Sequence, residues 1–325
     1  PTSLPGPFGM GDIGPMAYEF VDFLAETGQQ MWQILPIGPT GHGNSPYMSY
    51  SAMAGNHMLI SLEHLRDVGL LTQADLDGFP HFPEDAVDYG RVLPAKLQLL
   101  EKAAEAFSAS TDKETRTQYE QFCQERAFWL DDYAFFMALK KANGGASWSQ
   151  WEPALARREA PAMALWHDKL SDLIAEHKYF QFEFYRQWAA LKPYANDRHL
   201  PVVGDMPIYV AHNSVDVWSA PDNFLLDDAG QPYVVAGCPP DALSVEGQRW
   251  GNPLYNWTTQ KARGFDWWIA RMERMLDLFD IIRVDHFRAF AGFWEIDAKE
   301  ETAVNGRWVS APGHDLFRTD RKSVV

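Results

Sequence analysis

Three short apolar segments, each preceded by a stretch with helical periodicity, dominate the pattern of hydrophobic and polar positions. They are MWQILPI at 31–37, LPVVGDMPIYV at 200–210 and DIIRVDHF at 280–287. Apolar runs of this length are typical of buried parallel strands. A helix followed by a short strand, three times over, indicates βα units around a parallel sheet.

The helical stretches carry apolar residues three and four positions apart. One helix is predicted over 16–28 with Gly28 as its stop, another over 264–279, and the segment 62–195 is mostly helical. Their expected buried side chains are Phe20, Val21, Phe23, Leu24, Leu97, Leu100, Ala104, Phe107, Phe128, Tyr133, Phe136, Met137, Phe180, Phe184, Trp188, Leu191, Trp268, Ile269, Met272, Met275, Leu276 and Phe279.

This order of elements predicts an α/β fold, a (β/α)8 TIM barrel with a large helical insertion. An open doubly wound sheet fits less well, because no G-x-G-x-x-G follows any predicted strand. Residues 1–61 and 196–319 are assigned to the barrel, with a loop insertion at 211–263, and 62–195 to the helical insertion. The last six residues, 320–325, are interpreted as a non-native tail, because one encoding of DRKSVV matches a sequencing adapter.

Composition narrows the function. The 325 residues carry a formal net charge of −16, so the surface repels phosphate backbones and anionic lipid, and neither nucleic acid nor a membrane is expected as a partner. The two cysteines, Cys123 and Cys238, fit a reducing cytoplasm and exclude both a disulfide scaffold and a cysteine-based zinc site. The histidines form no spaced ligand set, and no metal or cofactor is predicted.

Aromatic residues make up 14% of the chain, and many lie beside glycine, proline, asparagine and aspartate rather than in helical stripes. Aromatic faces near carboxylates and amides suit sugars, whose C–H faces stack while their hydroxyls form hydrogen bonds. Tyr47 and Trp250 have such surroundings. A carbohydrate site is one interpretation; ordinary packing in ordered loops is the other.

The segment IRVDHFRAF at 282–290 carries the most specific chemistry. Side chains alternate along a strand, so Arg283 and Asp285 share one face while Ile282 and Val284 share the other. In a barrel, Arg283 and Asp285 face the interior near the C-terminal strand end, where such enzymes hold their sites. An arginine beside it keeps a carboxylate ionised and able to act as a nucleophile. Spacing alone leaves open a buried Arg–Asp pair that only fills the barrel.

At this strand the chain resembles the amylomaltases, the 4-α-glucanotransferases of glycoside hydrolase family 77. IRVDHFRAF is similar to their nucleophile strand. Further segments match in the right order: PTSLPGPFGMGDIGP at 1–15, LPIGPTGHGNSPYMSYSAMAGN at 35–56, GDMPIYV at 204–210 and GCPPDALSVEGQRWGNPLYNW at 237–257. The agreement of several motifs of this length makes the resemblance specific.

The resemblance implies a role for individual residues. Asp285 matches the catalytic nucleophile, Arg283 the arginine beside it, and Tyr47 the tyrosine that stacks on the sugar at the cleavage point. The other implied substrate-binding residues are Ser45 in the Ser-Pro-Tyr turn, Asp205, Asp241 and Trp250 at glucan-binding positions, Gln248 and Asn252 in the loop over the site, and His286 next to the nucleophile.

The implied function is transfer of α-1,4-glucan segments between maltooligosaccharides by a cytoplasmic enzyme, through a retaining double displacement. Two other functions stay open: an α-amylase-type hydrolase, and a glucan-binding barrel without catalysis. Neither oligomeric state nor chain-length preference follows from the sequence.

The family's acid/base glutamate lies on the barrel strand after the nucleophile strand, and no such motif follows Asp285 here. Nor does a first barrel strand precede PTSLP. The chain is therefore expected to be an internal, N-terminal-half fragment of the barrel, inactive and poorly folded by itself. Glu295, in FWEI, is the one nearby glutamate, and it is interpreted as structural.

Overall fold

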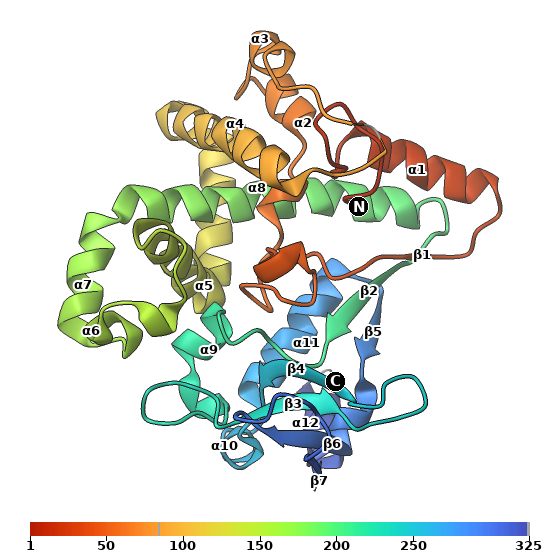
Figure 1. Cartoon of the computed structure of the whole chain (residues 1–325). Helices are drawn as coiled ribbons and strands as arrows, with labels where there is room; N and C mark the ends of the chain where they lie inside the picture. Colours follow the sequence, from red (N-terminus) through yellow and green to blue (C-terminus); the bar gives the residue numbers. More distant parts are fainter. Residues whose placement is uncertain (84, 324–325) are drawn as a thin grey trace.

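The computed structural model describes residues 1–83 and 85–323 and contains two sheets joined to a block of helices (Figure 1). The first sheet is parallel, with β1 (Trp32–Gln33), β2 (Val202–Pro207) and β5 (Ile281–Asp285) in the order β1-β2-β5. Each strand follows a helix: α1 (Pro15–Glu26), α8 (Ser171–Asn196) and α11 (Asp266–Leu278). The predicted alternation of helices and parallel strands is confirmed at all three places.

The first strand is shorter than predicted, and only one of its faces is buried. Ile34 is buried, whereas Met31 and Leu35 are 51% and 56% exposed, so the expectation of a fully buried segment is wrong. Pairing with β2 ends at the hydrogen bond from Ile34 N to Val203 O. Pro36 lies just beyond and has no N–H with which to extend the ladder.

The parallel sheet is open. Its central strand β2 is buried from Val202 to Met206, whereas Ile281 on β5 is 46% exposed. Within residues 1–83 and 85–323, β1 and β5 each pair on one side only. The architecture is a mixed α/β fold, and across the described residues the parallel sheet does not close into a barrel.

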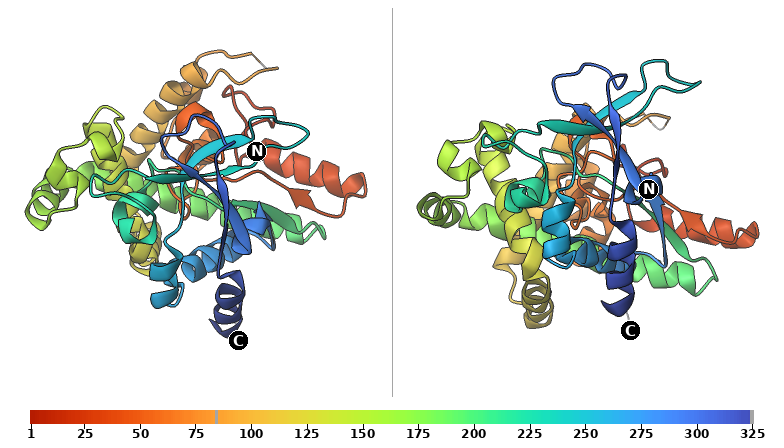
Figure 2. Two further views of the ribbon diagram at one scale, coloured as in Figure 1. Left: turned by 60° about the horizontal axis from the view of Figure 1, so that its bottom comes forward. Right: turned by 90° about the horizontal axis from the view of Figure 1, so that it is seen from below.

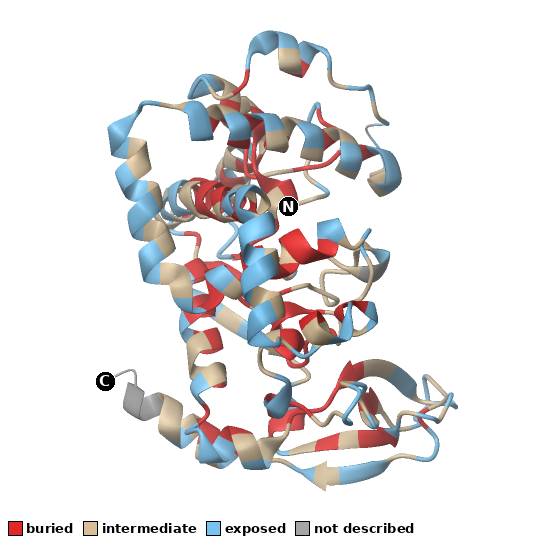
Figure 3. Ribbon diagram, turned by 90° about the vertical axis from the view of Figure 1, so that its left-hand side faces the viewer, coloured by how far each residue is buried: buried red, intermediate tan, exposed pale blue. Residues whose placement is uncertain are grey.

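Helices occupy most of the chain between β1 and β2 and lie above and to the left of the sheet in Figure 1. The helices before α8 are α2 (Leu62–Asp67), α3 (Gln73–Asp77), α4 (Tyr89–Ala109), α5 (Lys113–Ala142), α6 (Pro153–Ala156) and α7 (Ala160–Lys169). The long helices α5 and α8 pack against each other. Figure 3 shows buried residues on the inner faces of these helices and exposed residues on the outer ones.

Most of the predicted helix faces are buried, but three of their side chains are not. Phe23, Phe128 and Leu276 are 56%, 60% and 47% exposed, so their assignment to buried stripes is wrong. Each lies one position beside a core residue or at the border of the apolar stripe. The arc that a helix buries is narrower than the arc that apolar residues occupy.

The second sheet is antiparallel and was not predicted. Its strands are β3 (Val234–Cys238), β4 (Gln248–Pro253), β6 (Gly292–Asp297) and β7 (Arg307–Ser310), in the order β4-β3-β6-β7. The segment 211–263, predicted to be a loop insertion, therefore contributes two strands. They are short and lie between glycine and proline turns, and β3 pairs with β6, which is distant in sequence. No local pattern of hydrophobic and polar residues predicts pairing between strands so far apart in sequence.

Shorter elements complete the chain. They are the 3-10 turns η1 (His42–Asn44), η2 (His57–Leu59), η3 (Trp148–Gln150), η4 (Pro221–Asn223) and η5 (Phe287–Phe290), and the helices α9 (Val215–Ser219), α10 (Trp257–Ala262) and α12 (Gly313–Ser323). In Figure 2, α12 projects from the body. The predicted tail 320–325 begins within this helix, and residues 324–325 lie outside the described residues. Within the described part of the chain, no helix combines the length and apolarity needed to cross a membrane.

Candidate active site

The candidate site begins at the C-terminal ends of β2 and β5. These strands are in parallel register, with Asp205 opposite Arg283 and Pro207 opposite Asp285. Since β-strand side chains alternate, Asp205, Arg283 and Asp285 emerge on one face of the sheet. Residues from two distant parts of the sequence thus form one charged group, called here the cleft floor: Asp205, Arg283 and Asp285.

Direct hydrogen bonds hold the cleft floor together. Arg283 Nη1 donates to Asp205 Oδ1 at 2.7 Å, and Arg283 Nη2 donates to Asp285 Oδ1 at 3.2 Å. Tyr47 Oη donates to Asp205 Oδ2 at 2.7 Å. Both oxygens of Asp205 are therefore engaged, whereas one oxygen of Asp285 is held by Arg283 and Oδ2 has no partner within the described residues.

Burial divides the two carboxylates into different environments. The Asp205 side chain has no exposed surface, whereas those of Arg283 and Asp285 are 47% and 40% exposed. Arg283 and Asp285 are therefore not the buried pair that a purely structural interpretation requires. Asp205 anchors the network from below, and Asp285 presents an oriented carboxylate to solvent.

Two groups around Asp205, Tyr47 and Arg283, stay protonated at neutral pH. Burial, and then the hydrogen bond to Asp205, raise the pKa of Tyr47 to about 12, so its phenol stays protonated and donates at neutral pH. The Asp205 carboxylate raises the pKa of Arg283. Tyr47 and Arg283 are thus permanent hydrogen-bond donors to the buried carboxylate.

A cleft of about 370 Å³ opens above Asp285. It is lined by Tyr47, Met48, Pro207, Ile208, Tyr209, Gln248, Trp250, Asn252, Asp285 and His286. Six of these residues were predicted from the sequence to contact substrate. Met48, Pro207, Ile208 and Tyr209 were missed, although Pro207 ends the strand that carries Asp205 and the last two directly follow it. Their position in GDMPIYV was the signal that could have found them.

The antiparallel sheet supplies one wall of the cleft. The Trp250 ring on β4 lies edge-on to His286, with centroids 4.8 Å apart, and 6.2 Å from the Tyr209 ring. Trp250 Nε1 donates to Gln248 Oε1 at 3.0 Å. A tryptophan that touches two other lining residues and stays partly exposed presents its apolar surface to the cleft.

Asn252 and His286 shape the same wall. Asn252 is buried, and its Nδ2 donates to Val210 O at 2.9 Å, which ties β4 to the segment after β2. His286 follows Asp285 directly and adopts a left-handed conformation, with φ of 52°. This turn carries the chain away from the strand end beneath Trp250. Burial lowers the pKa of His286, so the imidazole is neutral at pH 7.

Four predicted substrate-binding residues are not among the residues that line the cleft. Asp205 and Arg283 belong to the cleft floor, and Ser45 and Asp241 lie in loops. Ser45 Oγ accepts a hydrogen bond from Tyr47 N at 3.3 Å and so shapes the turn that carries the tyrosine. Asp241 is exposed in the loop between β3 and β4, where Oδ1 accepts from Leu243 N and Ser244 N. In this structure both side chains organise loops.

The loop 38–56, which carries Tyr47, is anchored by helices. Gln181 on α8 is fully buried, and its amide both accepts from Gly55 N at 2.8 Å and donates to Gly55 O at 2.9 Å. Asp216 Oδ2 on α9 accepts from Ala52 N at 2.8 Å. Burial raises the pKa of Asp216 to about 6. The position of Tyr47 thus depends on helices distant in sequence.

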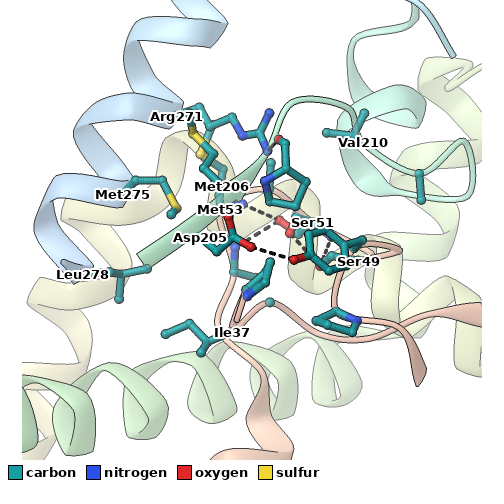
Figure 4. A pocket seen from close by; sticks show the side chains of 18 of the residues that line it. Ile37, Ser49, Ser51, Met53, Asp205, Met206, Val210, Arg271, Met275 and Leu278 are labelled. Carbon is teal, nitrogen blue, oxygen red and sulfur yellow. Dashed lines mark hydrogen bonds between the residues drawn. The ribbon is translucent and has the colours of Figure 1, made fainter. Parts of the chain in front are cut away.

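Tyr47 and Asp205 also help to line a second, small cavity of about 50 Å³. Figure 4 shows this cavity from close by. Arg271 on α11 reaches its rim, and its guanidinium donates to the carbonyl oxygens of Pro207 and Ile208. Arg271 is 3% exposed. It therefore fixes the turn of backbone that follows Asp205 and leads to Tyr209 in the cleft.

Other acidic groups lie apart from the cleft floor. Glu295 is on β6 and accepts from Arg307 Nε at 2.7 Å, an ion pair within the antiparallel sheet that fits the structural role predicted for it. No group of three or more His, Cys, Asp or Glu residues in the described ranges is arranged to hold a metal ion. The polar chemistry on view is that of a carboxylate, a guanidinium, a phenol and amides.

Comparisons with known proteins show what the chain is similar to. The family of 4-alpha-glucanotransferases, glycoside hydrolase family 77, matches residues 1–324. The 4-alpha-glucanotransferase of Synechocystis sp. is 47% identical over 325 residues, which are 100% of this chain and 64% of the relative. That of Thermus thermophilus is 48% identical over 98% of this chain and 63% of its own length. The chain therefore spans less than two thirds of these curated relatives.

Solved structures of amylomaltases are also similar to this chain. The amylomaltase from Streptococcus agalactiae, solved in complex with acarbose, has a TM-score of 0.95 and 44% identity, covering 99% of this chain and 65% of that one. The amylomaltase from Corynebacterium glutamicum has a TM-score of 0.77 at 20% identity, covering 98% and 44%, which shows a shared fold.

Proposed function

The chain belongs to the 4-alpha-glucanotransferase family of glycoside hydrolase family 77, and we propose that the complete protein that carries it transfers α-1,4-glucan segments between maltooligosaccharides. One observation carries the proposal: Asp285, oriented by Arg283 and partly exposed, lies at the base of a cleft walled by Tyr47 and Trp250. This is the arrangement that a nucleophilic carboxylate and a stacked sugar require.

Asp285 acts as the nucleophile in the first step. Its Oδ2 attacks the anomeric carbon of the bound glucan, and the bond from that carbon to the leaving oxygen breaks. The product is a covalent glycosyl ester on Asp285 and a shortened glucan. Arg283 holds Oδ1 and so orients the carboxylate, while the buried Asp205 fixes Arg283 in turn.

The leaving oxygen needs a proton from a second carboxyl group, which in retaining enzymes lies about 5–5.5 Å from the nucleophile. Asp205 is unsuitable because Arg283 and Tyr47 occupy both of its oxygens, and Glu295 is paired with Arg307. The curated relatives are longer than the part of them that matches this chain. We assign the acid to the corresponding additional part of the complete enzyme. The same group then removes the proton from the incoming 4-hydroxyl in the second step.

Stacking positions the sugar for attack. Tyr47 cannot rotate freely, because its hydroxyl is bonded to Asp205 and its turn is braced by Ser45. Its ring is the platform for the sugar at the cleavage point. Trp250, Gln248 and Asn252 form the opposite wall of the cleft. Asp241 and its loop contact the glucan only if the loop closes over the cleft. Exclusion of water by this loop favours transfer over hydrolysis.

We also propose a place for each part of the chain in the complete enzyme. β1, β2 and β5 are three successive strands of a (β/α)8 barrel formed by residues 1–61 and 196–319, with residues 62–195 inserted between them. The enzyme acts on α-1,4-glucans and needs no cofactor. A cytoplasmic location is proposed from the cysteine usage, although one relative, from Solanum tuberosum, is named as chloroplastic/amyloplastic.

Product analysis tests the function. The complete protein, incubated with maltotriose, should form glucose together with maltopentaose and longer glucans. A hydrolase would give only glucose and maltose, and a binding protein would leave the maltotriose unchanged. Either of those results contradicts the proposal.

A further inference from the structure

A further cavity, comparable in size to the cleft, lies outside it. Its volume is about 350 Å³, and it is formed where α5, α9, η4 and the start of α11 meet. It is called here the lateral cavity, defined by Phe128, Asp132, Asn223, Arg263, Asp266 and Trp267. None of the residues that line it also lines the cleft. The reaction proposed above makes no use of it.

Accessible aromatic surface lines the lateral cavity. Phe128 is 60% exposed, although its position on α5 is within a stripe predicted to be buried. Trp267 is partly buried against Phe224 and Tyr255 and contributes its remaining surface. A single exposed phenylalanine is ordinary on a protein surface. Two aromatic side chains lining one concavity give a ligand an apolar face to contact.

Hydrogen-bond acceptors lie beside these rings. Asp132 accepts from Arg158 Nη2 through Oδ1 at 2.6 Å, and Asp266 accepts from Trp267 N through Oδ1 at 2.7 Å. The second oxygen of each carboxylate remains for a ligand. Asp216, buried at the cavity's base, adds a third carboxyl group.

The charge of the lateral cavity narrows its ligand. Three carboxyl groups and one guanidinium, Arg263, line the cavity, and Arg263 already donates to Asp222 at 3.1 Å and to Asn223 Oδ1 at 3.1 Å. Arg158 pairs with Asp132, which leaves an excess of negative charge. An anion is therefore repelled. Within the described residues, these acidic groups do not form a group of three or more ligands that could hold a metal ion. A neutral molecule with hydroxyl donors and an apolar face fits, and a sugar has both.

We propose that the lateral cavity is a second binding site for α-1,4-glucan, which holds one end of a long substrate while another segment occupies the cleft. This inference rests on the proposed function and adds to it a site that favours long glucans. A long glucan gains from simultaneous binding at two sites, because the first contact raises its effective concentration at the second. A trisaccharide occupies one site at a time and gains nothing.

The lateral cavity is also connected to the loop 38–56. Ser51 and Met53 line both it and the small cavity that Tyr47 and Asp205 also line. Asp216, at its base, bonds to Ala52 N of the same loop. A glucan held in the lateral cavity therefore rests against the loop whose other side carries Tyr47.

Kinetics with two substrate lengths test the site. In the complete protein, KM is measured for a long linear α-1,4-glucan and for maltotriose. The KM for the long glucan divided by the KM for maltotriose is then compared among variants. Phe128→Ala should raise this ratio about fivefold, the effect of losing an anchoring contact. Asp266→Asn should raise it by about twofold. Phe23→Ala is the matched control, because Phe23 is 56% exposed on α1 and lines none of these cavities.

The outcomes separate this inference from the proposed function. If Phe128→Ala and Phe23→Ala give the same ratio as the unmodified protein, the lateral cavity does not bind glucan, while the proposed function stands. If the unmodified protein forms no longer glucans from maltotriose, the proposed function fails, and this inference fails with it. Both phenylalanines are exposed, so their thermal unfolding midpoints should stay close to that of the unmodified protein.

Discussion

The cleft floor and the cleft wall are built by different means. The floor, Asp205, Arg283 and Asp285, comes from two adjacent parallel strands, and direct charged hydrogen bonds fix its geometry. The wall, defined here as Tyr47 and Trp250, comes from a long loop and from the antiparallel sheet, and packing and single hydrogen bonds hold it. In the proposed function, the floor carries out bond cleavage and the wall recognises the sugar.

Because the floor and the wall are built differently, substitutions in the two regions should have different effects. A floor residue cannot be replaced by a residue of different charge without loss of function, because each is bonded to another charged group. Wall residues contribute surface, so their loss should weaken binding in proportion to the contact removed. The predictions below use this contrast.

The largest effect is expected for Asp285→Asn. An amide cannot form the glycosyl ester, so kcat for transfer should fall by at least ~10⁴ in the complete protein. Because Asp285 is partly exposed, thermal stability should change little. Asp228→Asn, an exposed carboxylate away from the cleft, is the control and should retain full activity. More than a few per cent of activity in Asp285→Asn would remove Asp285 from its assigned role.

Arg283→Met should impair both turnover and stability. It leaves the buried Asp205 carboxylate without its cationic partner, which should cost about 2–3 kcal/mol of unfolding free energy. It also releases Asp285 Oδ1, so kcat should fall by about 10² or more. Denaturant unfolding and maltotriose kinetics measure the two effects. A variant that loses stability with unchanged kcat would show that Arg283 only holds the strands together.

Wall substitutions should act mainly on KM. Trp250→Ala and Tyr47→Ala remove stacking surface and should raise KM for maltotriose about tenfold, the equivalent of roughly 1.4 kcal/mol. Tyr47→Phe separates the two roles of the tyrosine. It keeps the ring but leaves one oxygen of Asp205 unpaired, so it should lower stability by about 1–3 kcal/mol while KM stays near its original value. A large loss of stability in Trp250→Ala with unchanged KM would make that residue structural.

Acid should loosen the support of the wall. His177 on α8 is buried one helical turn before Gln181, and burial lowers its pKa to about 3; His57, also buried, has its pKa lowered to about 4. Their folded-state pKa values lie below the usual 6.5, so the stability they contribute is complete above pH 6.5. It is lost as the pH falls toward 4 and 3, by about 1 kcal/mol or more per histidine at pH 5.

Replacement of His177 isolates this effect. His177→Leu should flatten the decline of the unfolding free energy between pH 6.5 and 4, and His81→Leu, at an exposed histidine, should not. The measurement is denaturant unfolding of the complete protein followed by helical circular dichroism at several pH values. Identical slopes in the two variants would show that acid acts elsewhere.

How much the sequence predicts follows the same division. The alternation of side chains in IRVDHFRAF is a local property, so it placed Arg283 and Asp285 on one face, as the structure confirms. The bond between Tyr47 and Asp205 joins residues 158 positions apart, and no spacing reports it. Tyr47 could be assigned to a site only through its resemblance to a family motif.

The wall was predicted less well for a physical reason. β4 carries Gln248, Trp250 and Asn252, but it forms by pairing with β3, which in turn pairs with β6 across more than fifty residues of chain. Such non-local pairing leaves no periodic pattern in a strand of five or six residues, so the segment was predicted to be a loop. The resemblance found its residues, and the structure gives their positions.

The nucleophilic role of Asp285 is the central claim, and trapping the intermediate tests it most directly. The complete protein is incubated with a maltotriosyl fluoride, which supplies its own leaving group, then quenched in acid, digested and analysed by mass spectrometry. The account predicts that the peptide containing Asp285 gains the mass of one maltotriosyl group and that Asp285→Asn abolishes this gain. A maltotriosyl group on any other residue, or the same labelling in Asp285→Asn, would contradict it.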